Sequence, residues 1–387
     1  MKPPLKTIFG QPSWTLATDT VSASVTQTGG HLAPVTFRLG SRTVQPFSIS
    51  PWWNEKLDAG LPAIVRVLRG DFFCLPFGGN TTPYCGKNHP VHGDTANLRW
   101  QWAGYDTRKG MATLRLHMDL KTFRGTVDKC ITLVPGHTVV YQEHVVTGVD
   151  APTSLGHHAT LQFPDSPGAG RFSTSRLVHA QVFVEPTEKP EEGGYSILKP
   201  GAIIRDITRV PTITGGMADV SRFPARRGYV DIAIFCADRT LPVAWSAVAV
   251  PQEGYAWFSL RDPRVLASTL CWMSNNGRHY PPWNSRHKNV MGIEDITGFF
   301  HCGAAESARP NVLTRRGVPT SLKPTAKHPL HVRYIMGVVA IPKTFDRVKD
   351  ITIERGRITL LGAGGRKVST PVATGFLRTG SLNPAIA

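Results

Sequence analysis

Residues 113–120 read TLRLHMDL, and in this stretch apolar and polar side chains alternate. Leu114, Leu116, Met118 and Leu120 fall on one face, and the residues between them are polar or charged. A period of two is typical of a strand that turns one face to the core and the other to solvent. The stretch therefore predicts a half-buried β-strand.

Strand-like segments continue along the chain from this one. Residues 126–134 (TVDKCITLV) and 137–146 (HTVVYQEHVV) are separated by Pro135-Gly136, which predicts a hairpin. Further strands are expected at 229–237, 241–250, 331–341, 350–354 and 357–361. Helical periodicity is confined to 262–270 and 344–348. Strands do not alternate with amphipathic helices, so the sequence predicts an all-β fold, a large antiparallel β-sandwich with few short helices.

The chain is long enough for a substantial core. It has 387 residues, of which 41% are hydrophobic and 18% charged, a composition that excludes a disordered chain. The length alone suggests two or three domains, but all-β folds often form one unit at this size. Residues 185–202 are polar and rich in turn residues, and we expect a surface loop there rather than a linker. A single domain covering residues 1–387 is therefore expected.

The charge balance favours anionic partners. There are 44 Lys and Arg residues against 27 Asp and Glu, a formal net charge of +17. The basic residues are scattered, with Arg226-Arg227 and Arg315-Arg316 as the densest runs, and nucleic-acid-binding motifs are missing. We therefore expect no nucleic-acid partner. The excess charge either serves solubility or attracts a phosphorylated or carboxylated sugar.

The cysteines and the N-terminus bear on location. The six cysteines are widely spaced without a Cys-x-x-Cys pair, which indicates neither a zinc site nor a disulfide framework. Free thiols fit a reducing compartment. The N-terminal sequence has no apolar core of a signal peptide, and no run approaches the ~18 apolar residues of a membrane helix. A cytoplasmic protein that does not enter membranes is expected.

Three segments place polar functional groups within apolar sequence, and the first is 66–100. Here Arg69 follows an apolar run, and His89 and His92 lie in a loop rich in proline and glycine. Ordinary loop histidines and a surface arginine would explain this segment equally well. The His-x-x-His spacing lacks an evident third ligand, so we expect no metal site.

The second segment is TSLGHHATLQF, residues 153–163. If it is a strand, His157 shares its face with Leu155, Ala159 and other apolar residues, as a core histidine would. His158 shares the other face with polar residues, where a ligand could reach it. The periodicity therefore selects His158 as the candidate functional residue.

The third segment is NVMGIEDITGFF, residues 289–300, in which both faces of a strand would be largely apolar. Glu294 lies on the face of Val290 and Ile296, where burial disfavours a charged carboxylate and raises its pKa. Asp295 points to the opposite face. A hydrogen-bonded or solvated glutamate at a strand end is the alternative.

The segment WMSNNGRHYPPWNSRHKN, residues 272–289, precedes Glu294 and is rich in amide, cationic and aromatic side chains. Asparagines such as Asn284 can bond sugar hydroxyls, and an indole such as Trp283 can cover the apolar face of a sugar. A stiff, proline-rich surface loop would have a similar composition.

In this order, the segments resemble the galactose mutarotase-like superfamily, which includes the aldose 1-epimerases and the hexose-6-phosphate 1-epimerases. VLRGDFFCLPFGG followed by HGDTANLRW looks like the family's arginine–glycine strand with its His-Gly turn. LGHHATLQF is similar to the segment that carries the second histidine, and MGIEDITGFF to the strand that carries the catalytic carboxylate. Two departures are Asp295, where the family has proline, and Ala159-Thr160 after His158.

The resemblance implies a β-supersandwich whose concave face holds a monosaccharide or a sugar phosphate. Glu294 would act as general base on the anomeric hydroxyl and His158 as general acid at the ring oxygen. His92 would bond the ring region and Arg69 the hydroxyls. The reaction would need neither a metal nor an organic cofactor, and we expect a monomer or a homodimer.

Two other classes of function remain open. A lyase or hydrolase on the same scaffold is one, although a hydrolase needs two carboxylates around the bond and Glu294 alone stands out, with Asp94 and Asp295 as weaker candidates. A non-catalytic sugar-binding protein is the other, and the two departures support it. The sugar itself does not follow from the sequence.

Overall fold

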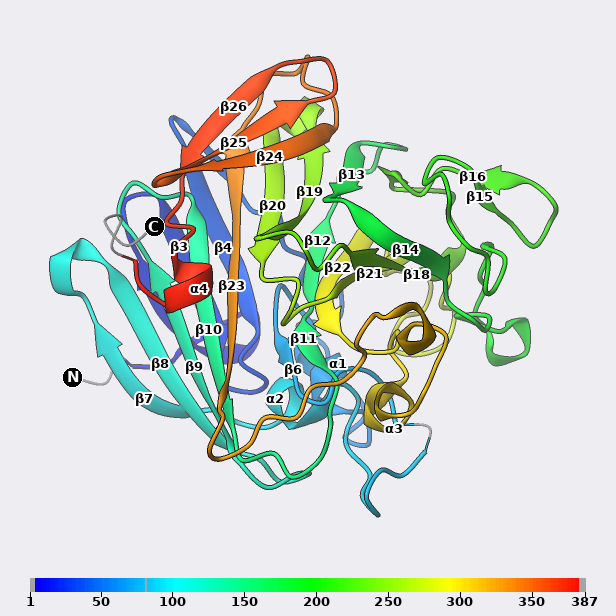
Figure 1. Ribbon diagram of the computed structural model, residues 1–387, viewed down its shortest axis with the longest axis horizontal. Helices are drawn as coiled ribbons and strands as arrows, with labels where there is room; N and C mark the ends of the chain where they lie inside the picture. The colour runs from blue at the N-terminus through cyan, green and yellow to red at the C-terminus, as the bar shows by residue number, and fades with distance from the viewer. Residues whose placement is uncertain (1–3, 81, 383–387) are drawn as a thin grey trace.

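The computed structural model describes residues 4–80 and 82–382, and its strands form several antiparallel sheets (Figure 1). The largest sheet has nine strands in the order β17-β13-β19-β20-β23-β10-β9-β8-β7. Their bounds are β7 Gln101–Asp106, β8 Ala112–Asp119, β9 Thr126–Leu133, β10 Val139–Thr147, β13 Gly170–Thr174, β17 Arg222–Phe223, β19 Ala244–Val250, β20 Tyr255–Arg261 and β23 Leu330–Ala340.

A seven-stranded sheet carries the residues of interest for function. Its order is β14-β18-β21-β22-β11-β6, with β12 also paired to β22. The bounds are β6 Phe73–Cys74, β11 Leu155–His157, β12 Ala159–Gln162, β14 Leu177–Val182, β18 Tyr229–Ala237, β21 Ser268–Asn275 and β22 Val290–Thr297.

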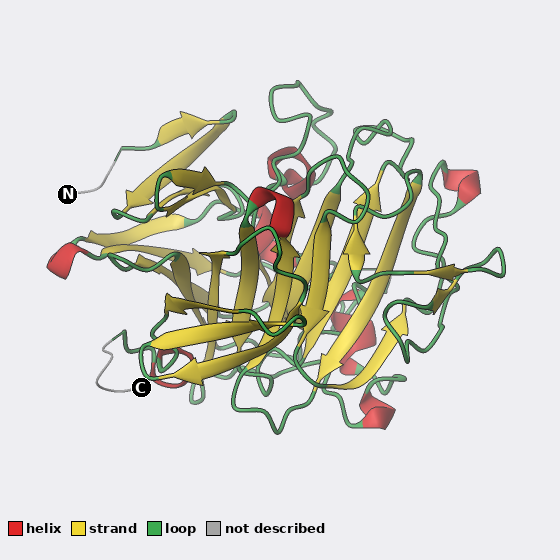
Figure 2. Ribbon diagram, turned by 90° about the horizontal axis from the view of Figure 1, so that it is seen from above, coloured by secondary structure: helices red, strands yellow, loops and turns green. Residues whose placement is uncertain are grey.

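Smaller sheets and four short helices complete the described chain, and Figure 2 shows how little of it is helical. The N-terminal sheet contains β1 Lys6–Ile8, β2 Gln11–Ala17, β3 Val21–Thr26, β4 Leu32–Leu39 and β5 Arg42–Val44. The C-terminal sheet contains β24 Val348–Glu354, β25 Arg357–Gly362 and β26 Lys367–Pro371, and a two-stranded ribbon joins β15 Val210–Pro211 to β16 Met217–Ala218. The α-helices are α1 Ala63–Val67, α2 Gly93–Asn97, α3 Gly303–Ala308 and α4 Phe376–Thr379.

The main core lies between the two large sheets. Phe235 on β18 and Ile293 on β22 belong to the same buried cluster as Trp257 on β20 and Met336 on β23. Burial of apolar side chains between two sheets is what holds a β-sandwich together. The predicted antiparallel β-sandwich with few short helices is confirmed.

The opposite face of the seven-stranded sheet is also buried. A second cluster joins Ile232, Leu270 and Ile296 on this face to Ile64 of α1 and to Phe300 before α3. A strand that is covered on both faces needs apolar residues at nearly every position. This explains why the sequences of β18 and β22 lack alternation, and it places any polar side chain of this face inside the protein.

The predicted strands are confirmed, including the hairpin at Pro135-Gly136, whereas both predicted helices are wrong. In 262–270, the Asp262 side chain accepts a hydrogen bond from the Arg264 backbone N–H in a turn, and β21 then begins at Ser268. β21 pairs with β18 and β22, so strand pairing outweighs the local preference for helix. Residues 344–348 contain a turn and the start of β24.

The state of the cysteines and the character of the helices can be compared with what the sequence predicts. All six cysteines are free, and Cys85 is exposed while Cys74, Cys236 and Cys271 are buried. Among residues 4–80 and 82–382, no helix combines the length and apolar character that a membrane span requires.

Candidate active site

A cavity of about 270 Å³ opens on the helix-covered face of the seven-stranded sheet. Side chains of the three central strands form its base, namely Ile232 of β18, Leu270 and Trp272 of β21, and Glu294 of β22. His158, between β11 and β12 of the same sheet, also lines the cavity, and the remaining lining residues are Ile64, Val65, Leu68, Phe72, Val91, His92, Arg278, Trp283 and His301. The cavity is thus an apolar pocket with a few polar groups, as small-molecule sites commonly are.

Strand register brings His158 and Glu294 together. β11 and β12 pair with β22 in the same register on either side of His158, so His158 lies directly across from Glu294. On its other side, the His158 backbone N–H donates to the Phe72 carbonyl at 2.9 Å, which continues the register between β11 and β6. Side chains that lie opposite each other in an antiparallel pair are close neighbours. His158 Nε2 and Glu294 Oε1 are 3.2 Å apart.

Burial controls the ionisation of this pair. Desolvation raises the pKa of Glu294 well above its usual 4.5 and lowers the pKa of His158 to about 3. Both shifts disfavour the charged forms, so the ligand-free pocket favours the uncharged state of both side chains, with the shared proton on Glu294. Phe72 contributes to this environment, because its ring stacks on His158 with centroids 4.4 Å apart.

Gly292 makes room for the carboxylate of Glu294. The two residues share one face of β22, and a Cβ at position 292 would lie 2.4 Å from Glu294 Oε1 and 3.2 Å from Trp272 Cβ. A side chain at this position would therefore displace the carboxylate.

His92 is held as a neutral hydrogen-bond donor. It precedes α2 with a left-handed backbone (φ 61°), and its Nδ1 accepts the Gly78 backbone N–H at 3.3 Å. Because Nδ1 accepts, the neutral ring carries its proton on Nε2. Desolvation lowers the pKa of His92 well below 6.5, and its ring meets that of His158 edge to face at 4.9 Å. The structure thus brings His92, His158 and Glu294 to one cavity.

Trp283 also lines this cavity, together with a cation that sequence analysis did not select. The Arg278 guanidinium lies 4.5 Å from the ring centroid of Trp283 and 5.4 Å from that of Trp272. Glu188 fixes it through a 2.6 Å contact between its Oε1 and Arg278 Nε. Sequence alone offered no signal for Glu188, which is 90 residues away. Trp272 could have been identified from the sequence, because a period of two on β21 puts it on the same face as Leu270.

Arg69 and Asn284 do not line this cavity, so the geometry gives no support to their predicted contacts with substrate. The Arg69 guanidinium is buried and donates to the carbonyls of Ile8 at 3.1 Å and Phe9 at 2.9 Å, so it ties the N-terminal hairpin to the core. Asn284 is exposed in a turn whose backbone N–H bonds the Tyr280 carbonyl. Both residue types suit sugar hydroxyls, but their backbones place them elsewhere.

His158 lines this cavity and His157 does not, as the strand periodicity predicts for the two faces. His157 is fully buried on the opposite face, where its Nδ1 lies 2.9 Å from Asp71 Oδ2 and its ring stacks on Tyr334 at 4.1 Å. Asp295 points the same way and meets Arg261 Nη1 at 2.8 Å. Neither group lines the cavity of Glu294.

Asp94 is a structural residue as well. Its carboxylate accepts hydrogen bonds from the backbone N–H groups of Lys121 and Thr122, both at 2.7 Å. Glu294 is therefore the one carboxylate that lines the cavity among the residues that the structure describes. In this part of the chain, no group of three or more His, Cys, Asp or Glu side chains has an arrangement that could hold a metal ion.

No family model matches the sequence, and no curated protein matches it. Solved structures do match in fold. A protein from Escherichia coli K12 named as a candidate aldose 1-epimerase superposes with a TM-score of 0.57 at 13% identity, over 86% of this chain and 100% of that one. A galactose mutarotase-like protein from Clostridium acetobutylicum gives 0.54 at 11% identity, over 87% and 98%.

A galactose mutarotase related enzyme from Lactobacillus acidophilus gives a TM-score of 0.52 at 13% identity, over 85% of this chain and 98% of that one. Identities this low carry information about architecture and not about activity. The sheets of this chain and these superpositions agree with the resemblance noted in the sequence. The chain has the galactose mutarotase-like fold.

Proposed function

We propose that the protein is an aldose 1-epimerase-like isomerase that interconverts the α and β anomers of a hexose or a related sugar. The observation that carries the proposal is the contact of Glu294 with His158, 3.2 Å apart at the base of a cavity. An acid and a base that share one proton in a desolvated pocket suit a reaction in which one proton leaves the substrate and another is delivered.

In the proposed mechanism, Glu294 takes the proton of the anomeric hydroxyl while His158 gives a proton to the ring oxygen. The bond between C1 and the ring oxygen breaks, and the open-chain aldehyde forms. Rotation about the C1–C2 bond presents the other face of the carbonyl carbon. The ring oxygen then adds to C1, His158 recovers its proton and Glu294 returns a proton to O1.

These roles require the proton of the pair to lie on His158 when ring opening begins. In the ligand-free pocket, desolvation favours it on Glu294. A sugar hydroxyl that donates to Glu294 stabilises the carboxylate, and this favours transfer of the proton to His158 across their contact. His92, with its proton on Nε2, is placed to donate a hydrogen bond to the substrate.

The composition of the cavity favours isomerisation over bond cleavage. Hydrolysis of a glycoside ordinarily uses two carboxylates that flank the scissile bond. Glu294 has no carboxylate partner among the described residues that line this cavity. The proposal therefore places proton exchange at an anomeric centre ahead of hydrolysis.

Arg278 bears on the choice between neutral and anionic sugars. It is the one Lys or Arg among the described lining residues, and Glu188 already neutralises part of its charge. A sugar phosphate would be bound through this guanidinium. The comparison of glucose with glucose 6-phosphate, in the wild type and in Arg278→Lys, tests this part of the proposal. Equal KM values for both sugars in both proteins would exclude recognition of the phosphate.

The experiment for the main proposal is polarimetry on freshly dissolved α-glucose, α-galactose and glucose 6-phosphate. We expect the wild type to accelerate equilibration and Glu294→Gln to lose about 10²–10⁴-fold of that rate. Asp231→Asn is the matched control, because Asp231 is another buried carboxylate of the same sheet that does not line the cavity. A wild type no faster than the buffer on the whole panel contradicts the proposal, and saturable sugar binding without exchange would then indicate a binding protein.

A further inference from the structure

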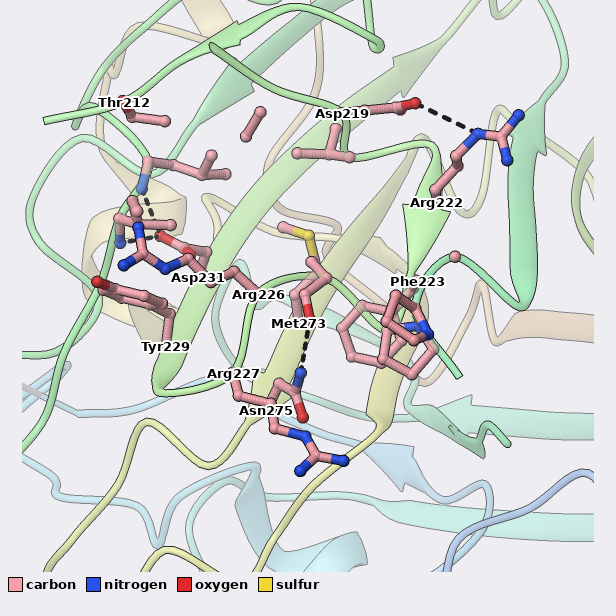
Figure 3. A pocket seen from close by; sticks show the side chains of 18 of the residues that line it. Thr212, Asp219, Arg222, Phe223, Arg226, Arg227, Tyr229, Asp231, Met273 and Asn275 are labelled. Atoms are coloured by element: carbon pink, nitrogen blue, oxygen red, sulfur yellow. Dashed lines mark hydrogen bonds and ion pairs between the residues drawn. The ribbon is translucent and has the colours of Figure 1, made fainter. Parts of the chain in front are cut away.

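The protein has a second and larger cavity, of about 710 Å³, whose lining includes the residues labelled in Figure 3. Asp231 of β18 and Met273 of β21 line it, whereas their chain neighbours Ile232 and Trp272 line the cavity of Glu294. Successive side chains of a strand point to opposite faces, so the two cavities lie on opposite faces of the same two strands. Residues between 212 and 220, which include β16, and residues 222–227 provide much of the remaining wall.

The carboxylate of Asp231 offers an acceptor to this second cavity. The residue is 6% exposed, and its Oδ1 accepts the backbone N–H groups of Ile197 at 3.1 Å and Leu198 at 2.9 Å. No hydrogen bond from a described residue reaches Oδ2. These two backbone bonds, drawn as dashed lines beside Asp231 in Figure 3, hold the side chain in place and leave its other oxygen for a ligand.

Asn289 is a buried amide in the wall of this cavity. The residue is buried, and its Oδ1 has no hydrogen-bond partner among the described residues. Its side chain also bonds Asp165, and a carboxylate can only accept, so the amide nitrogen faces Asp165. A buried amide oxygen without a partner is costly unless water or a ligand satisfies it. The same burial closes this oxygen off from the cavity, so Asn289 lines the cavity without adding an acceptor that a ligand could reach.

The cavity also contains one cation without an acidic partner. Arg227 pairs with Asp165, and Arg222 lies 3.6 Å from Asp219. Arg226 has no ion pair with a described residue, and its guanidinium lies 5.3 Å from the ring centroid of Tyr229. Arg226 and Asp231 balance each other in formal charge, which disfavours a strongly charged ligand.

Apolar surface completes the lining. Met273, Phe223 and Val220 are buried walls, and Met217 of β16 is 58% exposed beside them. A volume of this size is within the usual range of ligand sites, about 300–1,000 Å³. The cavity thus offers an acceptor on Asp231, a hydrogen-bond donor on Arg226 and apolar walls to the same ligand.

We propose that this second cavity is a saccharide-binding site, separate from the site of Glu294. A hydroxyl group of a neutral sugar would donate to Asp231, and Arg226 would donate to sugar oxygens. The C–H face of the sugar would pack on Met217 and Met273. A neutral polyol supplies both donors and acceptors, which this lining requires and which a polyanion would not match beside Asp231.

Methionine methyl groups allow the site to be observed directly. We would label the methionine methyl groups with ¹³C and titrate the full chain with maltose, with the resonances assigned from Met217→Leu and Met273→Leu. We expect saturable shifts at Met217 and Met273, in the wild type and equally in Glu294→Gln. Asp231→Asn keeps an acceptor for the two backbone N–H groups but places an amide nitrogen at the free position, and it should weaken maltose binding by about ten-fold or more.

Two controls separate this site from the first. Asp219→Asn changes an acid that lines the cavity but has no proposed sugar contact, and it should leave the maltose affinity unchanged. Asp231→Asn should leave the rate of anomer exchange unchanged. Met217→Trp changes an exposed side chain, should fold normally and should block the site, with Met273 as the reporter. The proposal is overturned if maltose shifts neither Met217 nor Met273. It is also overturned if the wild type, Asp231→Asn and Met217→Trp bind maltose with equal affinity. Either result counts whether or not the protein exchanges anomers.

Discussion

Glu294 and His158 lie opposite each other on paired strands, with Oε1 and Nε2 3.2 Å apart, and desolvation shifts their pKa values in opposite directions. Uncharged Glu294 can donate a proton, and uncharged His158 can accept one. The pair therefore behaves as one unit with one mobile proton.

If the pair acts as a unit, the effects of removing its members are not additive. Glu294→Gln and His158→Gln should each slow anomer exchange by about 10²–10⁴-fold, and the double variant should be no slower than the slower single variant. Polarimetry on the three proteins measures this. Fully additive losses would show that the two side chains act independently.

Glu294→Gln should stabilise the protein while it removes activity. The folded-state pKa of Glu294 is raised above 4.5, so between pH 4.5 and that raised pKa folding takes up a proton, and wild-type stability falls as pH rises. Glutamine does not titrate, so the free energy of unfolding of Glu294→Gln, relative to that of the wild type, should increase by up to about 1.4 kcal/mol per pH unit across this window. The difference should vanish below pH 4.5. Thermal unfolding from pH 4 to 8 tests this, and parallel curves for the two proteins would contradict the raised pKa.

Gly292→Ala should lower activity through the position of the Glu294 carboxylate. The added Cβ would lie 2.4 Å from Glu294 Oε1, and a displacement of about 1 Å in a catalytic group can cost ~10²-fold in rate. Gly364→Ala is the matched control, because a Cβ there meets nothing within 4 Å. We expect kcat to fall in the first variant and neither kcat nor the melting temperature to change in the second. An active Gly292→Ala protein would mean that the carboxylate does not need its present position.

Arg69→Ala should affect stability and leave substrate binding intact. The guanidinium bonds two carbonyls of the N-terminal hairpin, and hydrogen bonds to a charged group contribute about 1.5–3 kcal/mol each. Urea unfolding should show a loss of a few kcal/mol, whereas KM should match that of the wild type. A raised KM with unchanged stability would instead support the predicted contact between Arg69 and the substrate.

Trp283→Leu and Asn284→Ala compare two neighbours, of which one lines the cavity. Trp283 is buried beside Arg278, whereas Asn284 is exposed. We expect the tryptophan variant to raise KM several-fold, since aromatic contacts contribute about 0.5–1.5 kcal/mol beyond area burial, and the asparagine variant to be silent. The reverse order of effects would place the sugar on the other side of this loop.

Strand periodicity was sufficient to predict the sandwich and to assign His158 and Glu294 to their faces. These predictions depend on side chains a few residues apart on one strand, where a period of two fixes direction. The environment of Arg278 depends on Glu188, and that of Arg69 on the carbonyls of Ile8 and Phe9, which are 60 or more residues distant. Contacts between such distant segments leave no mark in local sequence, so these two arginines could not be assigned.

The helices predicted at 262–270 and 344–348 failed for a related reason. The helical preference of 262–270 is local, whereas β21 gains two hydrogen-bonded neighbours, β18 and β22, that the local sequence does not contain. In a sheet of this width, the central strands are determined by their partners as much as by their own residues.

Gly156 has a consequence for how the chain chooses between its adjacent histidines. A shift of β11 by one residue would bring His157 opposite Glu294 and His158 toward Asp71, so both places would still receive an imidazole. The shift would also bring Leu155 opposite Ile296, where a Cβ on the present residue, Gly156, would already lie 2.7 Å from the Ile296 Cα. The absence of a side chain at Gly156 thus favours the register in which His158, and not His157, lies opposite Glu294. A Gly156→Ala change would weaken this preference, and with it the choice of the proposed proton donor, before it disrupted the fold.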